Sequence, residues 1–470
     1  MKPLTIQQIR QAVGGKPLTS IPPKVAEITA VCTDTRRMEP GSMFIALTGE
    51  NFNGHDYLPD AAKGGAIAAI VEEPPKHELP NLHLIGVKST RQALGKLATY
   101  VRKHLLSKVI AVAGSNGKTS TKYLIDSALS GKLNGSISPK SFNNDIGVPL
   151  AIFPADPTQD YLVLEMGTNH PGEIKVLTDM ALPDIAVITS IGAEHLEFLG
   201  DLRGVRRENA SIISGLNPRG TLVYNGDDPE LASAVAPFPG RKIKFGFRLD
   251  VDNELFATHV ELLDNGVRFN LNNSKRSVFV PMLGRHTASN ALAAIAVARS
   301  MRLSEEEIIQ NLATAHGPEM RLQRSEVAGI TVLNDAYNAN PHSMKAALET
   351  LAALKPKHRR VAILGDMREL GESSDRYHKE IGEFAAACKL DLLVCVGKQA
   401  MLIAESAERH AMPVGSIVRF ADSSEAAKGV LKILREGDLV LLKASRTIRL
   451  ERVADAIAHS EPKFFRKAAS

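Results

Sequence analysis

The feature that most constrains this chain is an apolar strand that runs directly into a glycine-rich loop and then a helix. Residues 111–125 read AVAGSNGKTSTKYLI, which is the G-x-x-G-K-T spacing, because Val112 stands where the longer phosphate-loop pattern needs a glycine. Such glycines let backbone N–H groups converge on phosphate oxygens, while the lysine reaches the β- and γ-phosphates and the threonine ligates Mg²⁺. The loop therefore predicts a nucleotide site, and the alternative is an ordinary strand–helix turn. Its expected contacts are Gly114, Ser115, Asn116, Gly117, Lys118, Thr119 and Ser120.

The same pattern of an apolar strand ending in a polar turn recurs in two long regions. It is seen at 108–115, 160–167, 184–192 and 220–228, and again at 329–341, 359–367, 390–398, 416–422 and 437–445. Helical stretches such as 287–301 and 342–354 lie between these strands. This alternation predicts parallel sheets with crossover helices, in which ligands bind at the carboxyl ends of the strands. We expect the site in the cleft between the two units.

Two regions depart from that pattern and complete the domain prediction. Residues 255–281 alternate polar and apolar side chains around Asn265-Gly266, which predicts an antiparallel ribbon. Residues 1–105 mix short strands with Gly/Pro turns. We expect an α/β fold of three domains: a small mixed domain at 1–105, a central phosphate-loop domain at 106–312 with the antiparallel addition, and a Rossmann-like domain at 313–470.

Composition limits the possible classes of function. The 470 residues include 57 Lys+Arg and 52 Asp+Glu, a net charge of +5, which is too mild for a typical nucleic-acid scaffold. Three cysteines suggest no disulfide framework. The first residues lack an apolar signal core, and no apolar run approaches 18 residues, so we expect a cytoplasmic protein without a membrane span.

Two polar residues that follow strands are candidate metal ligands. Glu165 ends the strand in LVLEMG, where a carboxylate that binds the metal of a phosphate site is usual, although it could be an ordinary strand-end carboxylate. His195 lies in the turn GAEHLE, and a lone loop histidine is more often solvated. By itself, His195 would not predict a metal site.

Taken together, these motifs resemble those of the Mur ligases, ATP-dependent amide-forming enzymes of peptidoglycan synthesis. GSNGKTST (114–121), NNDIGVPL (143–150), LEMGTNHPGEI (164–174), SIGAEHLEFLG (190–200), GRHTASNALAA (284–294) and MRLQ (320–323) occur in the family's order and span nearly the whole chain. NDAYNANPHSM (334–344), GDMRELG (365–371) and the uridine-type segment 33–72 favour one step. That step joins D-alanyl-D-alanine to UDP-N-acetylmuramoyl-tripeptide through an acyl phosphate.

The resemblance also implies roles for individual residues. Lys118, His195 and Arg321 would be catalytic, with ATP and Mg²⁺ as cofactors. Further ATP contacts would be Asn290 on the adenine side and Asp335, and the metal ligands would be Thr119, Glu165 and His195. The substrate contacts would be Thr35, Arg36 and Ser42 for the uridine diphosphate, Asn143 and Asn144 for the muramyl peptide, Tyr337, Asn338 and Asn340 for ATP and dipeptide, and Arg446 for a carboxylate. Arg446 could equally form a structural ion pair.

One position departs from the family pattern. Most Mur ligases carry a lysine after the histidine motif that is carbamylated and helps to hold a second Mg²⁺, and Asn209 occupies that position here. Either Glu208 supplies the missing anion, or His195 and substrate hold the metal alone, or the alignment is shifted by one residue. We favour weaker second-metal binding, because Glu208 should point about 100° away on a helix.

Two other functions stay open from the sequence. One is a different Mur-type step or a folylpolyglutamate-type ligase, against which DAYNANP and the uridine-type segment weigh. The other is a non-catalytic module that binds nucleotide and UDP-muramyl peptide, for which Asn209 is the only support. We also expect domain closure about a hinge near His316-Gly317-Pro318, and a monomer that binds no nucleic acid.

Overall fold

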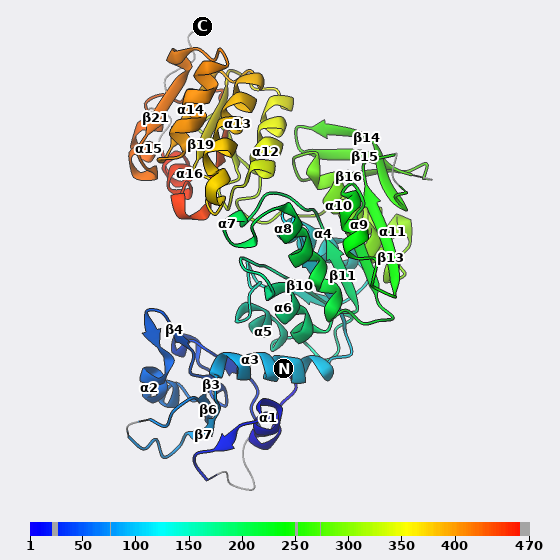
Figure 1. The fold of residues 1–470 in the computed structure, drawn as a ribbon, viewed down its shortest axis with the longest axis vertical. Coiled ribbons are helices and arrows are strands. Elements are labelled where there is room, and N and C mark those ends of the chain that lie inside the picture. Colours follow the sequence, from blue (N-terminus) through cyan, green and yellow to red (C-terminus); the bar gives the residue numbers. More distant parts are fainter. Residues whose placement is uncertain (21–26, 76, 250–251, 273, 461–470) are drawn as a thin grey trace.

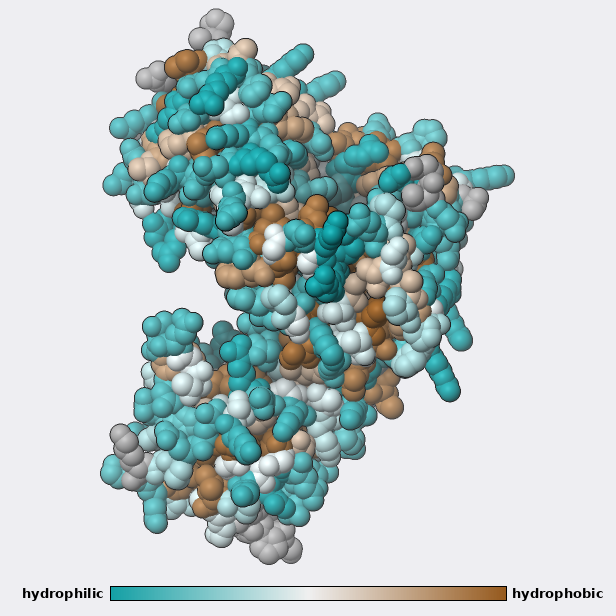
Figure 2. Space-filling view, viewed as in Figure 1, coloured by the Kyte–Doolittle hydropathy of each residue, from teal (hydrophilic) through white to brown (hydrophobic). Residues whose placement is uncertain are grey.

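The computed structural model describes residues 1–20, 27–75, 77–249, 252–272 and 274–460, and their strands form three large sheets that follow one another along the long axis (Figure 1). The surface seen in Figure 2 is mostly hydrophilic and is deeply indented between the N-terminal and C-terminal units. These described residues contain no helix long and apolar enough to cross a membrane. Cys32, Cys388 and Cys395 are all free thiols.

The N-terminal unit is a five-stranded sheet of order β1-β7-β6-β3-β2, parallel except for β1 against β7. A small hairpin of β4 and β5 projects from it. The strands are β1 (Lys16–Pro17), β2 (Val31–Cys32), β3 (Met43–Ile45), β4 (Thr48–Gly49), β5 (Phe52–Asn53), β6 (Ala68–Val71) and β7 (His83–Gly86). The helices are α1 (Ile6–Val13), α2 (Leu58–Lys63) and α3 (Thr90–Lys103).

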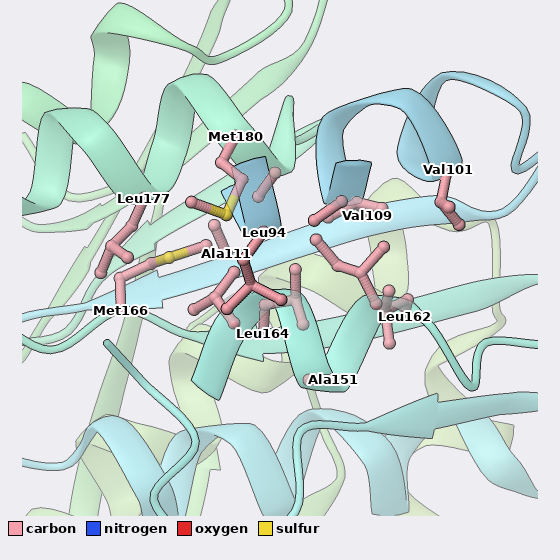
Figure 3. Close-up of a cluster of buried hydrophobic side chains, with 14 of the residues drawn as sticks. Leu94, Val101, Val109, Ala111, Ala151, Leu162, Leu164, Met166, Leu177 and Met180 are labelled. Atoms are coloured by element: carbon pink, nitrogen blue, oxygen red, sulfur yellow. The ribbon is translucent and has the colours of Figure 1, made fainter. Parts of the chain in front are cut away.

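Helix α3 connects the N-terminal unit to the central one. Its buried face packs against α1 on one side and against α5 and α6 on the other. Figure 3 shows Leu94 and Val101 of α3 beside Val109 of β8 and Met180 of α6. Arg102 is buried and donates to the carbonyl of Ala181 and the carboxylate of Asp184, at 2.9 and 2.8 Å. The N-terminal unit is thus held to the central unit by a shared hydrophobic core and a buried cation.

The central unit contains a nine-stranded sheet of order β16-β15-β14-β13-β12-β11-β8-β10-β9. It is parallel from β9 to β14 and antiparallel from β14 to β16, so the predicted antiparallel ribbon is confirmed. Its turn lies one residue earlier than predicted, at Asp264 and Asn265, because Gly266 already begins β15 and pairs with Leu263. Asn273 of that segment lies outside the described residues. The strands are β8 (Lys108–Ala113), β9 (Gly135–Ile137), β10 (Tyr161–Glu165), β11 (Ile185–Ile188), β12 (Thr221–Asn225), β13 (Arg241–Gly246), β14 (Leu255–Leu263), β15 (Gly266–Leu271) and β16 (Ser277–Val280).

Helices cover both faces of this sheet because alternate strand residues are apolar on both sides. Val109 and Ala111 of β8 face the core under α3, α5 and α6, whereas Ile110 and Val112 face α4 and α10. Helix α10 lies close against α4 because its buried positions are mostly alanine. The helices are α4 (Lys118–Ser130), α5 (Gly147–Ile152), α6 (Glu173–Ala181), α7 (Leu196–Leu199), α8 (Leu202–Ala210), α9 (Pro229–Ala234), α10 (His286–Ser300) and α11 (Glu305–Leu312).

The C-terminal unit has a six-stranded sheet of order β17-β18-β22-β19-β20-β21, parallel except for the edge strand β17. The strands are β17 (Gln323–Val327), β18 (Ile330–Asn334), β19 (Arg360–Gly365), β20 (Leu392–Val396), β21 (Ile417–Phe420) and β22 (Leu439–Lys443). The helices are α12 (Pro341–Ala353), α13 (Ser374–Ala387), α14 (Ala400–Arg409), α15 (Ser423–Val430) and α16 (Glu451–Ala458). The predicted α/β fold of three units is confirmed.

Candidate active site

The loop between β8 and α4 has a backbone that only glycine fits at two positions. Gly114 has φ 128° and Gly117 has φ 83°, both in the left-handed region. A Cβ at Gly114 would lie 2.1 Å from Oγ1 of Thr189, and one at Gly117 would lie 2.4 Å from Oδ1 of Asn290. The loop is fixed to the next strand end, because the N–H of Ser115 donates to the carbonyl of Ser190 at 2.7 Å. Its amides and the N-terminus of α4 form an anion site.

Lys118 begins α4 and folds back over this loop. Its Nζ donates to the carbonyl of Gly114 at 2.5 Å and lies 3.6 Å from Oε2 of Glu194. Glu194 was not predicted as a site residue, although it lies next to His195 in a quoted motif, because a carboxylate in a turn carries no signal of burial. An ammonium held by a loop carbonyl and one carboxylate can turn to a phosphate when a nucleotide binds.

Glu165 ends β10 inside a buried polar cluster. Its Oε1 accepts from Nδ2 of Asn143 at 3.0 Å, and its Oε2 lies 3.4 Å from Nζ of Lys122. Burial lowers the pKa of Lys122, whose Nζ also donates to the carbonyls of Ser138 and Lys140 at 2.8 and 2.7 Å. The prediction missed Lys122, although it lies one helical turn after Lys118 and so on the same face of α4. The cluster fixes the Glu165 carboxylate at the strand end.

Three adjoining cavities lie near the phosphate loop, and residues of the loop line two of them. The central cavity, of about 420 Å³, lies between the central and C-terminal units. It shares Asn116, Gly117 and Arg321 with a second cavity of about 520 Å³ beside α10, which we call the α10 cavity. It shares Glu194 and His195 with a third of about 230 Å³ at the end of β22, the β22 cavity. The predicted residues that line the central cavity are Ser115, Asn116, Gly117, Lys118, Thr119, Asn143, Asn144, Glu165, His195, Arg321, Tyr337, Asn338 and Asn340.

The α10 cavity combines apolar walls with buried polar groups. Ser120, Asn290 and Asp335 of the predicted set line it. Nδ2 of Asn290 and Nδ1 of His286 are buried without a hydrogen-bond partner. Burial lowers the pKa of His286 to about 4, so its ring is neutral at pH 7. Unpaired amide and imidazole groups beside the phosphate loop are suited to the edge of a heterocycle.

Asp335 ends β18 and is held by a buried cation. Its Oδ2 accepts from Nζ of Lys443 at 2.6 Å, and its Oδ1 accepts from the N–H of Leu322 at 3.2 Å. Burial lowers the pKa of Lys443. Lys443 ends β22, within the predicted strand and turn at 437–445, but the sequence indicates no role for it, because its pairing with β18 is not readable from either segment.

His195 lies where the central and C-terminal units touch. It has φ 48° and precedes α7, which lies beside the C-terminal unit in Figure 1. Its Nδ1 forms a hydrogen bond with the carboxylate of Glu369, and this bond lowers the pKa of Glu369. Nε2 of His195 lies 3.9 Å from Oε2 of Glu194. In the neutral tautomer whose Nδ1 proton is donated to Glu369, Nε2 carries the lone pair, which is the arrangement of a metal-binding histidine.

The two units also meet through polar side chains of the C-terminal unit. Nδ2 of Asn340 donates to Oδ1 of Asn116 at 2.9 Å. Within the C-terminal unit, the guanidinium of Arg321 lies 4.2 Å from the ring centre of Tyr337. Arg446 lines the β22 cavity, and its Nη1 also lies 3.6 Å from Oε1 of Glu451. The sequence left open whether Arg446 forms a structural ion pair or contacts a ligand, and in the structure it forms the ion pair while facing a cavity.

Three predicted residues lie apart from these cavities, in the N-terminal unit. Arg36 is exposed and forms two 2.8 Å hydrogen bonds with Asp34. The hydroxyl of Ser42 is buried and donates to the carbonyl of Glu39 at 2.6 Å. Thr35 begins the short 3-10 turn that also contains Arg36. Any ligand that contacts these residues and the central cavity together would have to be long.

Helix α8, which carries Asn209 where most Mur ligases have a lysine, presents no carboxylate to the cavities. Both oxygens of Glu208 accept backbone N–H groups at the start of α6, from Gly172 at 2.6 Å and Ile174 at 2.8 Å. Nδ2 of Asn209 donates to the carbonyl of Val205 at 3.0 Å. Glu208 therefore caps α6, and the alternative in which it supplies the missing anion is not favoured by this geometry.

The side-chain oxygens near the phosphate loop can hold a hard divalent cation only if a bound ligand completes its coordination. Among the described residues, no three His, Cys, Asp or Glu side chains come together as a metal-binding group. Oε2 of Glu165 and Oε1 of Glu194 are nevertheless buried without a hydrogen-bond partner. Mg²⁺ typically binds one or two carboxylates together with phosphate oxygens and water, so these oxygens and the Thr119 hydroxyl fit it.

Comparison with known proteins gives matches along nearly the whole chain. Family models match residues 27–102 ("Mur ligase family, catalytic domain"), 112–298 ("Mur ligase middle domain") and 320–446 ("Mur ligase, glutamate ligase domain"). UDP-N-acetylmuramoyl-tripeptide–D-alanyl-D-alanine ligase of Bacillus subtilis is 34% identical over 97% of this chain and 98% of its own. The protein of that name from Escherichia coli is 37% identical over 92% and 94%.

Solved structures agree with the sequence relatives. A MurF crystal structure from Acinetobacter baumannii has a TM-score of 0.88 at 32% identity, and covers 98% of this chain and 100% of its own. The MurF ligase from Thermotoga maritima in complex with ADP has a TM-score of 0.80 at 27% identity, with 91% and 97% covered.

Proposed function

This chain belongs to the Mur ligase family, and on that premise we propose that it joins D-alanyl-D-alanine to UDP-N-acetylmuramoyl-tripeptide at the expense of ATP, in peptidoglycan synthesis. The activated intermediate is an acyl phosphate, formed when the tripeptide carboxylate attacks the γ-phosphoryl group. The observation that carries the proposal is the central cavity, where the phosphate loop, Glu165 and His195 face Arg321 and Asn340 of the C-terminal unit.

The main barrier to this reaction is charge, because a carboxylate must approach a triphosphate. The loop amides and Lys118 bind the β- and γ-phosphates, and Arg321 faces them across the cavity. Asn143 and Asn144, which line the same cavity, position the muramyl peptide. Positioning of the reactants and neutralisation of their negative charge supply most of the rate acceleration, since the reaction needs little covalent catalysis by the protein.

The α10 cavity receives the adenosine part of ATP. Asn290 and neutral His286 contact the base, and Asp335 contacts the ribose or phosphates. The β22 cavity receives the dipeptide, with Arg446 available to its carboxylate and Tyr337 and Asn338 on its wall. Thr35, Arg36 and residues 48–55, which include the hairpin of β4 and β5, bind the uridine diphosphate, so the UDP-muramyl peptide extends from the N-terminal unit to the central cavity. Ser42 contributes through the turn that it stabilises.

Mg²⁺ is the proposed metal: Thr119 and Glu165 would hold one ion at the phosphate loop, and His195 would hold a second at the turn before α7. When bound, it neutralises charge on the phosphate oxygens. The N-terminal domain comprises 1–105, the central domain 106–312 and the C-terminal domain 313–470 in this proposal. The enzyme acts as a monomer in the cytoplasm, where ATP and UDP-linked precursors are available.

The test is phosphate release from ATP with UDP-N-acetylmuramoyl-tripeptide, measured with and without D-alanyl-D-alanine. We expect release that requires the dipeptide. Release only with another amine would indicate a different step of the family, and tight ATP binding without release would indicate a binding module. Gel filtration with light scattering tests the monomer, for which we expect a mass near 50.7 kDa.

A further inference from the structure

Glu194 is a buried carboxylate with no role in the mechanism proposed above. Its side chain is 7% exposed, and it lines both the central cavity and the β22 cavity. Oε1 has no hydrogen-bond partner, while Oε2 lies 3.6 Å from Nζ of Lys118 and 3.9 Å from Nε2 of His195. A buried carboxylate oxygen without a partner is costly, so a ligand that satisfies it would bind there.

The neighbours of Glu194 make that ligand a cation. Its partner Lys118, 3.6 Å away, belongs to the phosphate loop, and its ammonium can turn to the phosphates of a bound nucleotide. Glu194 would then face a polyphosphate with no countercharge, which is repulsive in a buried site. A divalent cation between them converts the repulsion into attraction.

Nε2 of His195, which lines the same two cavities as Glu194, is available as a metal ligand. Nδ1 of His195 is bonded to Glu369, and Nε2 lies 3.9 Å from Oε2 of Glu194, so in the neutral ring the lone pair of Nε2 can bind a cation shared with this carboxylate. Helix α8 contributes no competing anion, since Glu208 caps α6 and Asn209 is bonded to Val205.

We propose that Glu194 is a ligand of the second Mg²⁺, together with Nε2 of His195 and oxygens of the bound substrates. This proposal rests on the proposed function and adds to it a metal ligand from the turn before α7. It replaces the expectation that His195 and substrate hold this metal alone. The alternative role of Glu194 is to position Lys118 only, and that role predicts a change in nucleotide affinity without a change in metal binding.

The experiment counts Mn²⁺ ions by the loss of the free Mn²⁺ signal in electron paramagnetic resonance. The full chain is saturated with β,γ-methylene-ATP and UDP-N-acetylmuramoyl-tripeptide. We expect two bound Mn²⁺ per wild-type complex, and we expect Glu194→Gln to weaken the second by roughly tenfold or more while the first is unchanged. Glu194→Asp, which keeps the charge, should recover part of this affinity. Glu197→Gln is the matched control, because Glu197 is three residues away and exposed.

Nucleotide binding and thermal unfolding of each variant are measured in parallel. Two equally tight Mn²⁺ ions in Glu194→Gln would overturn the proposal, and so would a single Mn²⁺ in the wild-type complex. Weaker nucleotide binding with unchanged Mn²⁺ binding would assign Glu194 to Lys118 alone and also overturn it. A wild-type chain that does not bind the nucleotide analogue at all would instead contradict the proposed function.

Discussion

Nδ2 of Asn340 donates a hydrogen bond to Oδ1 of Asn116, so the first turn of α12 in the C-terminal unit is tied directly to the phosphate loop. The same Asn340 caps α12, since its Oδ1 accepts from the N–H of Ser343 at 2.9 Å. One side chain therefore links the order of the C-terminal helix to the position of the loop that binds phosphate. Together with the bond between His195 and Glu369, it holds the two units around the central cavity.

Replacing Asn340 with serine should separate these two roles. Serine can still cap α12, but its hydroxyl is too short to reach Asn116. Loss of one hydrogen bond costs about 1 kcal/mol, so we expect kcat/KM to fall roughly fivefold while the unfolding temperature is unchanged. The measurement is a double-mutant cycle with Asn116→Ser on dipeptide-dependent phosphate release. Fully additive losses in the double variant would show that the contact carries no coupling.

Lys118 is the residue on which the proposed chemistry depends most. Lys118→Ala should lower kcat/KM by about 100-fold or more, because the β- and γ-phosphates lose their main side-chain cation. Phosphate release at saturating dipeptide is the measurement. Lys175→Ala is the control, since Lys175 is exposed on α6 and pairs with Asp179. Normal turnover by the Lys118 variant would refute the assignment of the phosphate site.

Gly117 tests the shape of the loop without changing its charge. Gly117→Ala forces a side chain into a left-handed conformation and against Asn290, so nucleotide affinity should fall roughly tenfold or more. Gly14→Ala is matched in backbone, because Gly14 has φ 69°, but a Cβ there meets no heavy atom within 4 Å. Nucleotide binding is measured by calorimetry. Equal affinities for the two variants and wild type would mean that the loop adapts to the added methyl.

The features that the sequence predicted are those encoded by neighbouring residues. The loop at 114–120, the antiparallel ribbon within 255–281 and the strand ending at Glu165 each depend on local patterns of glycine, alternation and apolar runs. Strands β13 and β17 were missed, since their exposed charged side chains hide the apolar pattern of a strand.

The partners that complete the site come from distant segments, and no local pattern predicts them. Lys443 meets Asp335 across 108 positions, and Glu369 meets His195 across 174. Glu194 shows why residue type alone is insufficient, because only the packing around it reveals that one oxygen is buried without a partner. Pairing and burial are set by tertiary structure, whereas the motifs are set by sequence.

Asn209 leads to a prediction about bicarbonate. A side chain amide cannot be carbamylated, and here it is bonded to the carbonyl of Val205, so bicarbonate should not stimulate turnover. The dependence on Mg²⁺ concentration should also be less cooperative than for a site with a carbamylated lysine. Turnover is compared in bicarbonate and in chloride at equal pH and ionic strength. A reproducible increase with bicarbonate would contradict both expectations.

His286 predicts how stability changes with pH. Burial lowers its folded pKa from 6.5 to about 4, so between these values the unfolded chain binds a proton that the folded chain does not. The contribution of this residue is therefore complete above pH 6.5 and is lost as the pH falls toward 4. At pH 5 the loss is about 2 kcal/mol in the free energy of unfolding.

His286→Gln should reduce the difference in unfolding temperature between pH 7.5 and pH 5. Comparing this difference between the variant and wild type removes any effect of the substitution that does not depend on pH. His77→Gln, at an exposed position, should keep the wild-type difference. An unchanged pH dependence in His286→Gln would show that this imidazole titrates alike in the folded and unfolded chains.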